Sequence, residues 1–244
     1  MSESGRMPEA GRMSQVGPLP ESNRLPEAGW ARLPAVDRVP APWRNGGGTT
    51  VDVIVRGAGR TVGARPGSVA GSRVGSRVDF DWRISIATVE RDGDFSRYPG
   101  VDRWLMPLSA GGLTLVNDGA LVPVAQHEVH AFPGERAVAA VGVSEPTLDL
   151  NLMLRRGRSV GSLRTIDAVG RLALTNAAEE ELVAVVLDGD FDTDSNAVRD
   201  AAPDGPRVAR SLARHDAVFL GAGGEVTLYG AGRIAVARIA QLPT

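Results

Sequence analysis

A series of short runs that favour β-strands, separated by turn signals, most restricts the fold of this chain. The runs are rich in Val, Ile, Leu and Thr. They cover residues 51–55, 82–89, 104–108, 113–116, 138–143, 148–154, 182–187, 217–220, 225–229 and 234–239. Turn sequences such as Asn117-Asp-Gly119 and Gly221-Ala-Gly-Gly224 lie between them. Residues 162–174 could include a short helix, but no long segment keeps a helical period. The pattern predicts an all-β chain of hairpins that close into sandwiches or barrels.

Two segments of low complexity are set apart from the predicted core. Residues 1–40 are rich in Pro, Gly, Glu, Ser and Arg, and residues 4–11 recur in similar form at 22–29. This composition predicts a disordered leader, with a peptide recruitment motif as the alternative. Residues 56–78 contain Arg, Gly and Ser but no acidic residue before Asp79, and they exceed an ordinary loop. We expect a flexible insertion there, with a functional lid as the alternative.

The remaining chain divides into two series of strands. The pattern pauses around residues 155–158, and a second series begins near residue 180. We therefore expect a first module over 41–157, which contains the 56–78 insertion, and a second module over 158–244.

Composition excludes several classes of protein. The 244 residues carry a formal net charge of −2, every basic side chain is Arg, and no Cys is present. The lack of Cys excludes disulfides, Cys-ligated metals and a thiol nucleophile. The near-neutral charge argues against a nucleic-acid partner. Since no apolar run approaches the roughly 18 residues that span a bilayer, we expect a soluble, cytoplasmic protein without a membrane partner. Whether it forms a homodimer is left open.

Polar residues alternate with apolar ones in two of the runs. In 82–86, Arg83 and Ser85 face away from three large apolar residues. In 148–154, Asp149 and Asn151 face away from four leucines. This polar face could be the solvated side of an antiparallel sheet. Alternatively, it lines the mouth of a barrel, where its side chains form a pocket for a small polar ligand.

Four ordered blocks identify a family resemblance. They are Trp43-Arg-Asn-Gly-Gly-Gly-Thr-Thr-Val-Asp-Val53, Asp81-Trp-Arg-Ile-Ser-Ile-Ala87, Asp92-Gly-Asp-Phe-Ser-Arg-Tyr-Pro-Gly-Val-Asp-Arg103 and Asp149-Leu-Asn-Leu-Met-Leu-Arg-Arg-Gly157. Together they resemble the HutD/Ves family, bacterial members of the cupin superfamily that are linked to histidine utilisation. The resemblance implies a bicupin, with two RmlC-like jelly-roll modules and the family's conserved residues around the first module's pocket.

Candidate ligand-binding residues come from these blocks. Consecutive glycines can expose backbone N–H groups to an anion, or can simply form a tight turn. An arginine can hold a carboxylate with two parallel hydrogen bonds, and Arg83 is favoured because it alternates with Ser85 beside Trp82. Phe95 is expected to form an apolar wall, and Ser96 to offer a hydroxyl. The predicted ligand-binding set is Arg44, Asn45, Gly46, Gly47, Gly48, Trp82, Arg83, Ser85, Ser96, Arg103, Asp149 and Asn151.

The sequence predicts neither a metal nor another cofactor. In a strand, His127 and His130 would point to opposite faces, unlike the paired histidines of metal-binding cupins. Residues 188–194 superficially match a calcium loop, but Ser195 and Ala201 stand where that loop needs Gly and Glu, so we expect a solvated acidic loop. No nucleophile and base pair is recognisable, and the catalytic residues are unknown.

Two hypotheses of function follow. The first is a metal-independent bicupin that binds a small anionic metabolite, with a regulatory role. By the family resemblance, the ligand would be an intermediate of histidine degradation, such as urocanate or a formylated or formimino glutamate. Arg83, Asn45 and the glycine amides would meet its carboxylate, and Asp149 and Asn151 its polar end. The second is a metal-independent isomerase or hydrolase that acts on the same acids, with Asp149 or a His as general acid/base. An interaction protein with a vestigial pocket is a third, weaker alternative.

Overall fold

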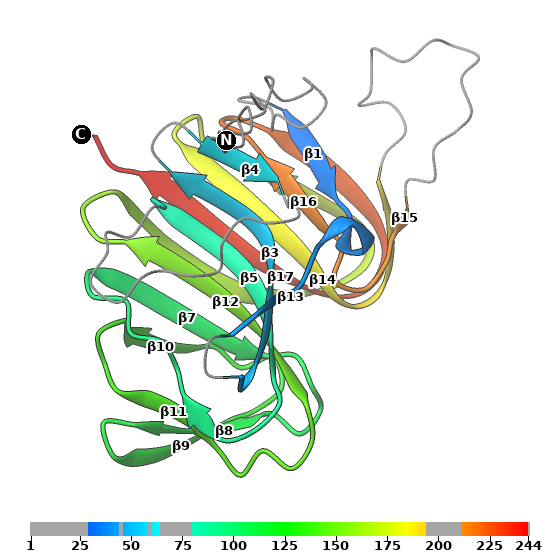
Figure 1. Ribbon diagram of the computed structural model, residues 1–244. Helices are drawn as coiled ribbons and strands as arrows, with labels where there is room; N and C mark the ends of the chain where they lie inside the picture. Colours follow the sequence, from blue (N-terminus) through cyan, green and yellow to red (C-terminus); the bar gives the residue numbers. More distant parts are fainter. Residues whose placement is uncertain (1–28, 44–45, 58–59, 64–79, 194–210, 244) are drawn as a thin grey trace, which may run out of the picture.

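The computed structural model describes residues 29–43, 46–57, 60–63, 80–193 and 211–243, which fold almost entirely into β-strands (Figure 1). One 3-10 turn, η2 (Ala35–Asp37), is the only helical element among them. The all-β prediction is confirmed. Within these ranges, no helix is long and apolar enough to cross a membrane.

The first module contains two sheets. The seven-stranded sheet has the order β10-β7-β12-β5-β3-β2, with β4 paired to β3. Its strands are β2 (Ala41–Pro42), β3 (Gly48–Gly57), β4 (Arg60–Gly63), β5 (Trp82–Val89), β7 (Val101–Pro107), β10 (His130–Pro133) and β12 (Thr147–Arg155). The four-stranded sheet has the order β6-β11-β8-β9. Its strands are β6 (Gly93–Asp94), β8 (Leu113–Asn117), β9 (Ala120–Val124) and β11 (Val138–Val141). An apolar cluster that includes Phe95, Leu105, Leu115 and Phe132 connects these two sheets.

The second module is one six-stranded sheet of the order β1-β16-β14-β17-β13, with β15 paired to β14. Its strands are β1 (Trp30–Leu33), β13 (Ser159–Thr175), β14 (Glu180–Thr193), β15 (Ser211–Leu212), β16 (Ala217–Leu220) and β17 (Glu225–Gln241). Three of these strands are long and strongly curved (Figure 1). Two modules of β-strands, joined between β12 and β13, are consistent with the predicted bicupin.

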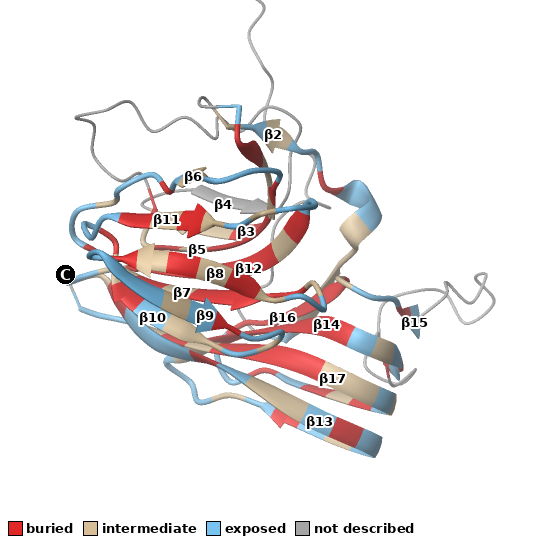
Figure 2. Cartoon of the chain, turned by 90° about the horizontal axis from the view of Figure 1, so that it is seen from below, coloured by how far each residue is buried: buried red, intermediate tan, exposed pale blue. Residues whose placement is uncertain are grey.

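The seven-stranded and six-stranded sheets share the largest apolar core. Trp82, Ile84 and Leu152 on one sheet pack with Val185 and Phe219 on the other. Buried residues run along β5 and β12 in the first sheet and along β14 and β17 in the second (Figure 2). Burial of a large apolar side chain stabilises a fold by about 1.5–3 kcal/mol, so this interface holds the two modules together.

A polar cluster crosses the same interface. The carboxylate of Glu181 on β14 accepts hydrogen bonds from Arg56, from Trp82 Nε1 at 2.9 Å and from Gln241 Nε2 at 3.1 Å. The Arg56 guanidinium also lies 5.2 Å from the ring centroid of Phe219. One buried carboxylate therefore links strands of both sheets through hydrogen bonds.

Residues 162–174 form no helix, contrary to one expectation. They lie in β13, which pairs with β17 in unbroken register from Ser159 opposite Gln241 to Thr175 opposite Glu225. β17 is likewise one strand, whereas the sequence predicted two, at 225–229 and 234–239. Its glycines allow the strand to continue, because a Cβ on Gly230 or Gly232 would meet a carbonyl oxygen of β14 at about 2 Å. Long-range pairing outweighs the local pattern in both cases.

The acidic segment 188–194 is not the loop that the sequence predicted. Residues 188–193 continue β14, and a bulge between Val186 and Asp188 shifts their register against β17. The Asp188, Asp190 and Asp192 side chains are exposed, while Phe191 between them is buried. The acidic side chains are thus solvated as expected, but on a strand. Asp194 lies outside the described residues.

The predicted disordered leader, residues 1–40, is wrong for 29–40. β1 pairs with β16 from Trp30 opposite Leu220 to Leu33 opposite Ala217, so this segment is an edge strand of the second module. The expected flexible insertion at 56–78 is also wrong in part, because β3 runs to Gly57 and residues 60–63 form β4 beside it. Residues 1–28, 58–59 and 64–79 lie outside the described ranges.

Candidate functional site

The face of the seven-stranded sheet that points into the first module carries buried polar side chains. The register sets Asn151 of β12 opposite Ser85 of β5 and Leu105 of β7. Asp149 and Arg103 occupy the same face. The exposed fractions are 3% for Ser85, 1% for Asp149, 5% for Asn151 and 8% for Arg103. The interpretation of a solvated sheet face is therefore wrong. These side chains lie inside the module, as the alternative interpretation required.

Arg103 lies in a box of aromatic rings. Its guanidinium carbon is 4.9 Å from the ring centroid of Phe132, 5.6 Å from that of Tyr98 and 5.7 Å from that of Phe95. Burial lowers the pKa of Arg103 below its ordinary value because water no longer solvates the charge. No carboxylate of the described residues lies within 4.0 Å of this guanidinium. The positive charge is thus held by rings and neutral acceptors.

Asn151 connects this cation to a buried acid. Arg103 Nη2 donates to Asn151 Oδ1 at 3.3 Å, and Asn151 Nδ2 donates to Asp149 Oδ1. Burial raises the pKa of Asp149 to about 7, although the hydrogen bond from Asn151 and the charge of Arg103 favour the ionised form. Arg103 Nε and Asp149 Oδ2 are both buried without a hydrogen-bond partner. We call Arg103, Asn151 and Asp149 the interior polar chain.

The other predicted arginine on this face is already neutralised. Arg83 Nε donates to Asp52 Oδ1 at 2.6 Å, and the two side chains are 13% and 16% exposed. Arg83 therefore pairs with β3, whereas Arg103, which was less favoured from the sequence, has no ionic partner among the described residues.

Two further predicted residues, Trp82 and Ser96, do not contribute their side chains to the interior polar chain. Trp82 is fully buried on the opposite face of β5, in the core between the modules, where its Nε1 donates to Glu181. The side chain of Ser96 is exposed, and this residue meets the site through its carbonyl oxygen, which accepts from Arg103 Nη1 at 3.2 Å. A contact made by a backbone carbonyl oxygen cannot be predicted from the type of residue.

The glycine run forms the turn into β3. Gly46 N donates to Trp43 O at 3.1 Å, and Trp43 N donates to Gly48 O at 2.9 Å. A Cβ on Gly48 would meet the carbonyl oxygen of Thr88 at 1.9 Å, so only glycine allows β3 to approach β5 there. Glu90 N donates to the carbonyl of Gly47. The turn interpretation accounts for these contacts, and a ligand role for Gly46–Gly48 stays a prediction. Arg44 and Asn45 lie outside the described residues.

The histidines do not gather into a metal site. His130 begins β10 and its Nε2 is 3.0 Å from Asn117 Nδ2, while His127 lies in the preceding turn with φ of 62°. Across the described ranges, no three His, Asp or Glu side chains are grouped so that they could hold a metal ion.

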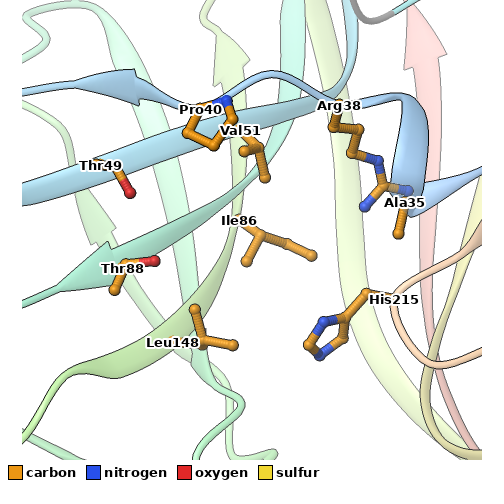
Figure 3. A pocket seen from close by; sticks show the side chains of 9 residues that line it. All are labelled: Ala35, Arg38, Pro40, Thr49, Val51, Ile86, Thr88, Leu148 and His215. Atoms are coloured by element: carbon orange, nitrogen blue, oxygen red, sulfur yellow. The ribbon is translucent and has the colours of Figure 1, made fainter.

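A cavity of about 290 Å³ lies at the end of the interface between the modules (Figure 3). The segment that follows β1 contributes Arg38, the turn before β16 contributes His215, and β5 contributes Ile86 and Thr88. Sequence reasoning missed this cavity. Arg38 falls within residues 1–40, which the sequence predicts as a leader, and His215 belongs to no motif that indicates a site.

The strand order and pairing define an all-β protein of two modules, the first of which encloses this buried polar site. A family model described as HutD matches residues 35–237, and the chain belongs to the HutD family.

Individual relatives agree with this assignment. Protein Ves of Cronobacter sakazakii is 33% identical over 127 residues, which cover 51% of this chain and 60% of that protein. A 21.2 kDa protein of Pseudomonas putida, described by its place in the hutC 3′ region, is 31% identical over 141 residues, or 57% of this chain and 66% of that protein. The chain thus spans less than two thirds of the length of these curated relatives.

A solved structure shows the same fold. The structure described as HutD from Pseudomonas fluorescens SBW25 in a formate condition matches with a TM-score of 0.64 and 22% sequence identity. The match covers 88% of this chain and 100% of that one.

Proposed function

We propose that this chain binds a small anionic metabolite at the interior polar chain of the first module. The observation that carries the proposal is the Arg103 guanidinium, which is buried without an ion-pair partner among the described residues. Removing an unpaired charge from water costs several kcal/mol. A carboxylate beside Arg103 would offset that cost, and the unpartnered Nε supplies a donor for it.

The same geometry supports a ligand with a second polar group. Asp149 has an unpartnered Oδ2 and a pKa of about 7, so both of its protonation states are populated near neutral pH. Its carboxyl group can accept a hydrogen bond when ionised and donate one when protonated. In this proposal Arg103 holds the carboxylate, while Asp149 and Asn151 contact the other end of the ligand.

We propose an acid of histidine degradation as the ligand, namely urocanate or a formylated or formimino glutamate. Each joins a carboxylate to a group that can hydrogen-bond with Asp149. The family name and the position of the Pseudomonas putida relative beside hutC support this choice of pathway. In this proposal, occupancy of the site adjusts histidine utilisation, which gives the protein a regulatory role.

One observation favours an enzyme as the second candidate. A carboxyl group with a pKa near 7 is suited to general acid/base catalysis at neutral pH, and Asp149 has such a pKa. An isomerase or hydrolase acting on the same acids would then use Asp149 to move a proton. Metal-free turnover of any of the three acids that is lost in Asp149→Asn would favour this candidate over a binding protein.

Calorimetric titration of the full chain with urocanate, formylglutamate and formiminoglutamate tests the binding proposal. We expect saturable binding of at least one acid, and an affinity at least tenfold weaker in Arg103→Met, since a charge-assisted hydrogen bond contributes about 1.5–3 kcal/mol. Arg83→Met is the matched control, because it removes an arginine of the same face that Asp52 already neutralises. Thermal unfolding of both variants establishes that they are folded. The proposal would be contradicted if none of the acids gave a heat of binding, or if the two variants lost the same amount of affinity.

A further inference from the structure

The cavity between the modules lies apart from the interior polar chain. It lies on the other face of the seven-stranded sheet, where Val51, Ile86 and Leu148 border the inter-module core. We propose that it binds a small monocarboxylic acid with an apolar body. The carboxylate would lie beside Arg38 and His215, and the body would cover the apolar floor.

Arg38 is the charged group of this site. Its side chain reaches the cavity and is buried, with the residue 8% exposed (Figure 3). One nitrogen, Nη2, donates to the carbonyl of Leu33 at 3.0 Å, and Nε is buried without a partner. Burial lowers the pKa of Arg38 to about 10, so it stays protonated at neutral pH. No carboxylate of the described residues lies within ion-pair distance of it.

Two acids favour the charged form of Arg38: Asp37, which is exposed and forms no ion pair with it, and Asp216, which is committed to other partners. Asp216 Oδ2 accepts from Arg32 Nη2 at 2.7 Å and from Ala213 N at 3.2 Å, and its Oδ1 accepts from Ala35 N at 2.6 Å. These bonds hold the η2 segment against the turn before β16. The Arg38 guanidinium therefore keeps an excess positive charge at the wall of the cavity, where a bound anion would be stabilised.

His215 places a second polar group at the same end of the cavity. Figure 3 shows its imidazole below Arg38, across from the side chains of β3, β5 and β12. His215 Nε2 is buried without a partner. Burial, together with the charges of Arg214 and Arg38, lowers the pKa of His215 to about 4. At neutral pH the ring is uncharged, and it can donate one hydrogen bond to a carboxylate.

The rest of the cavity selects an apolar body. Val51, Ile86 and Leu148 lie side by side on neighbouring strands, with Val51 opposite Ile86 in the register. The hydroxyls of Thr49 and Thr88 lie at the end away from Arg38 (Figure 3). The volume of about 290 Å³ is near the lower limit for ligand pockets, which favours a small molecule. Since the lining comes from both modules, the ligand would contact both at once.

Methyl NMR of the full chain, titrated with hexanoate and with hexanamide, tests the site. We expect hexanoate to shift the methyl signals of Val51, Ile86 and Leu148 in a saturable way. Hexanamide has the same apolar body without the charge, and we expect it to bind at least tenfold more weakly. Arg38→Met should weaken hexanoate binding at least tenfold. The control Arg136→Met, which removes an exposed arginine paired with Asp118 on the first module, should leave the affinity unchanged.

A second variant keeps the proposal testable if Arg38→Met does not fold. Thr88→Leu fills the far end of the cavity without touching the guanidinium, so it should weaken hexanoate binding more than acetate binding. Equal shifts with hexanoate and hexanamide would overturn the proposal. Shifts confined to Val101 and Leu105, near Arg103, would do the same, because they would assign the binding to the first module's interior.

Discussion

The seven-stranded sheet packs on the six-stranded sheet with one face and encloses the interior of the first module with the other. On the inter-module face, the buried Glu181 carboxylate accepts hydrogen bonds from Arg56, Trp82 and Gln241. On the interior face, Arg103 Nε and Asp149 Oδ2 have no partner, and the cation and the acid are separated by Asn151. Alternate residues of the same strands therefore form two different buried environments.

This difference separates a structural role from a binding role. A buried ion that is paired and hydrogen-bonded fastens two elements in one arrangement, whereas a buried ion without an ionic partner destabilises the folded state. Strained or costly groups of the second kind are typical of functional sites. The comparison thus assigns a stabilising role to the Glu181 cluster on the inter-module face and ligand recognition to the interior polar chain, and substitutions in each can break it.

The largest effect is expected for Glu181→Gln on the inter-module face. Removing this carboxylate leaves the Arg56 charge in the core, and loss of one partner of a buried ion pair costs about 3–5 kcal/mol of the free energy of unfolding. Urea denaturation measures the change. The neighbouring Glu180→Gln is the control, because its partly exposed pair with Arg238, at 3.2 Å, should contribute less than about 1 kcal/mol. Equal losses in the free energy of unfolding of the two variants would contradict the structural role proposed for this face.

An effect of opposite sign is expected for Asp149→Asn on the interior face. Folding raises the pKa of Asp149 from 3.8 to about 7, so the folded state prefers the protonated acid. The resulting stability is complete below pH 4 and is lost as the pH rises through 7. Asparagine resembles the protonated acid at every pH. The variant should therefore match the parent at pH 4 and exceed it at pH 8, by at most about 4 kcal/mol.

Denaturation of both proteins at several pH values between 4 and 8 measures this difference. The stability of the parent should fall over that window relative to the variant. A variant that is less stable than the parent at pH 8 would show that the ionised Asp149 is well accommodated, and the contrast between the two faces would fail.

The smallest effect is expected for Arg83→Met. Its pair with Asp52 is about as shielded as the Arg56–Glu181 pair, with side chains 13% and 16% exposed against 16% and 11%. It joins neighbouring strands of one sheet, however, and does not link the two modules. We expect a loss of about 1–2 kcal/mol in the free energy of unfolding, between the values for exposed and buried pairs. A loss as large as that of Glu181→Gln would mean that the interior face also carries much of the stability. Denaturation under the same conditions as for Glu181→Gln makes the comparison direct.

The sequence predicted the fold where the local pattern and the tertiary pairing agree. The runs at 82–89 and 217–220 coincide with β5 and β16, because their apolar side chains are buried wherever the sheet lies. β13 was missed because its burial follows no simple period and its pairing with β17 comes from a distant segment. β1 was missed because a short run next to a Pro-rich stretch carries too little hydrophobic pattern to stand out.

The site was predictable to a similar extent. The alternation in 148–154 selected Asp149 and Asn151, and the family resemblance added Arg103, which the structure joins to them. The same alternation already set Trp82 on the face away from Arg83, so its inclusion in the site contradicted the pattern. Which arginine lacks an ionic partner could not be predicted, because the pairing of Arg83 with Asp52 depends on the register of β3 against β5.

The edge strand β1 links the order of synthesis to the order of folding. Trp30 pairs with Leu220, so a segment made early must wait for almost the whole chain before it finds its partner. Such a high-contact-order pairing forms late, whereas the hairpin of β8 and β9 closes locally. Until β1 arrives, the backbone groups along one edge of β16 are open to pairing with other chains. The pairing of β1 with β16 is thus the closing step of folding, and it protects the edge of β16 from aggregation.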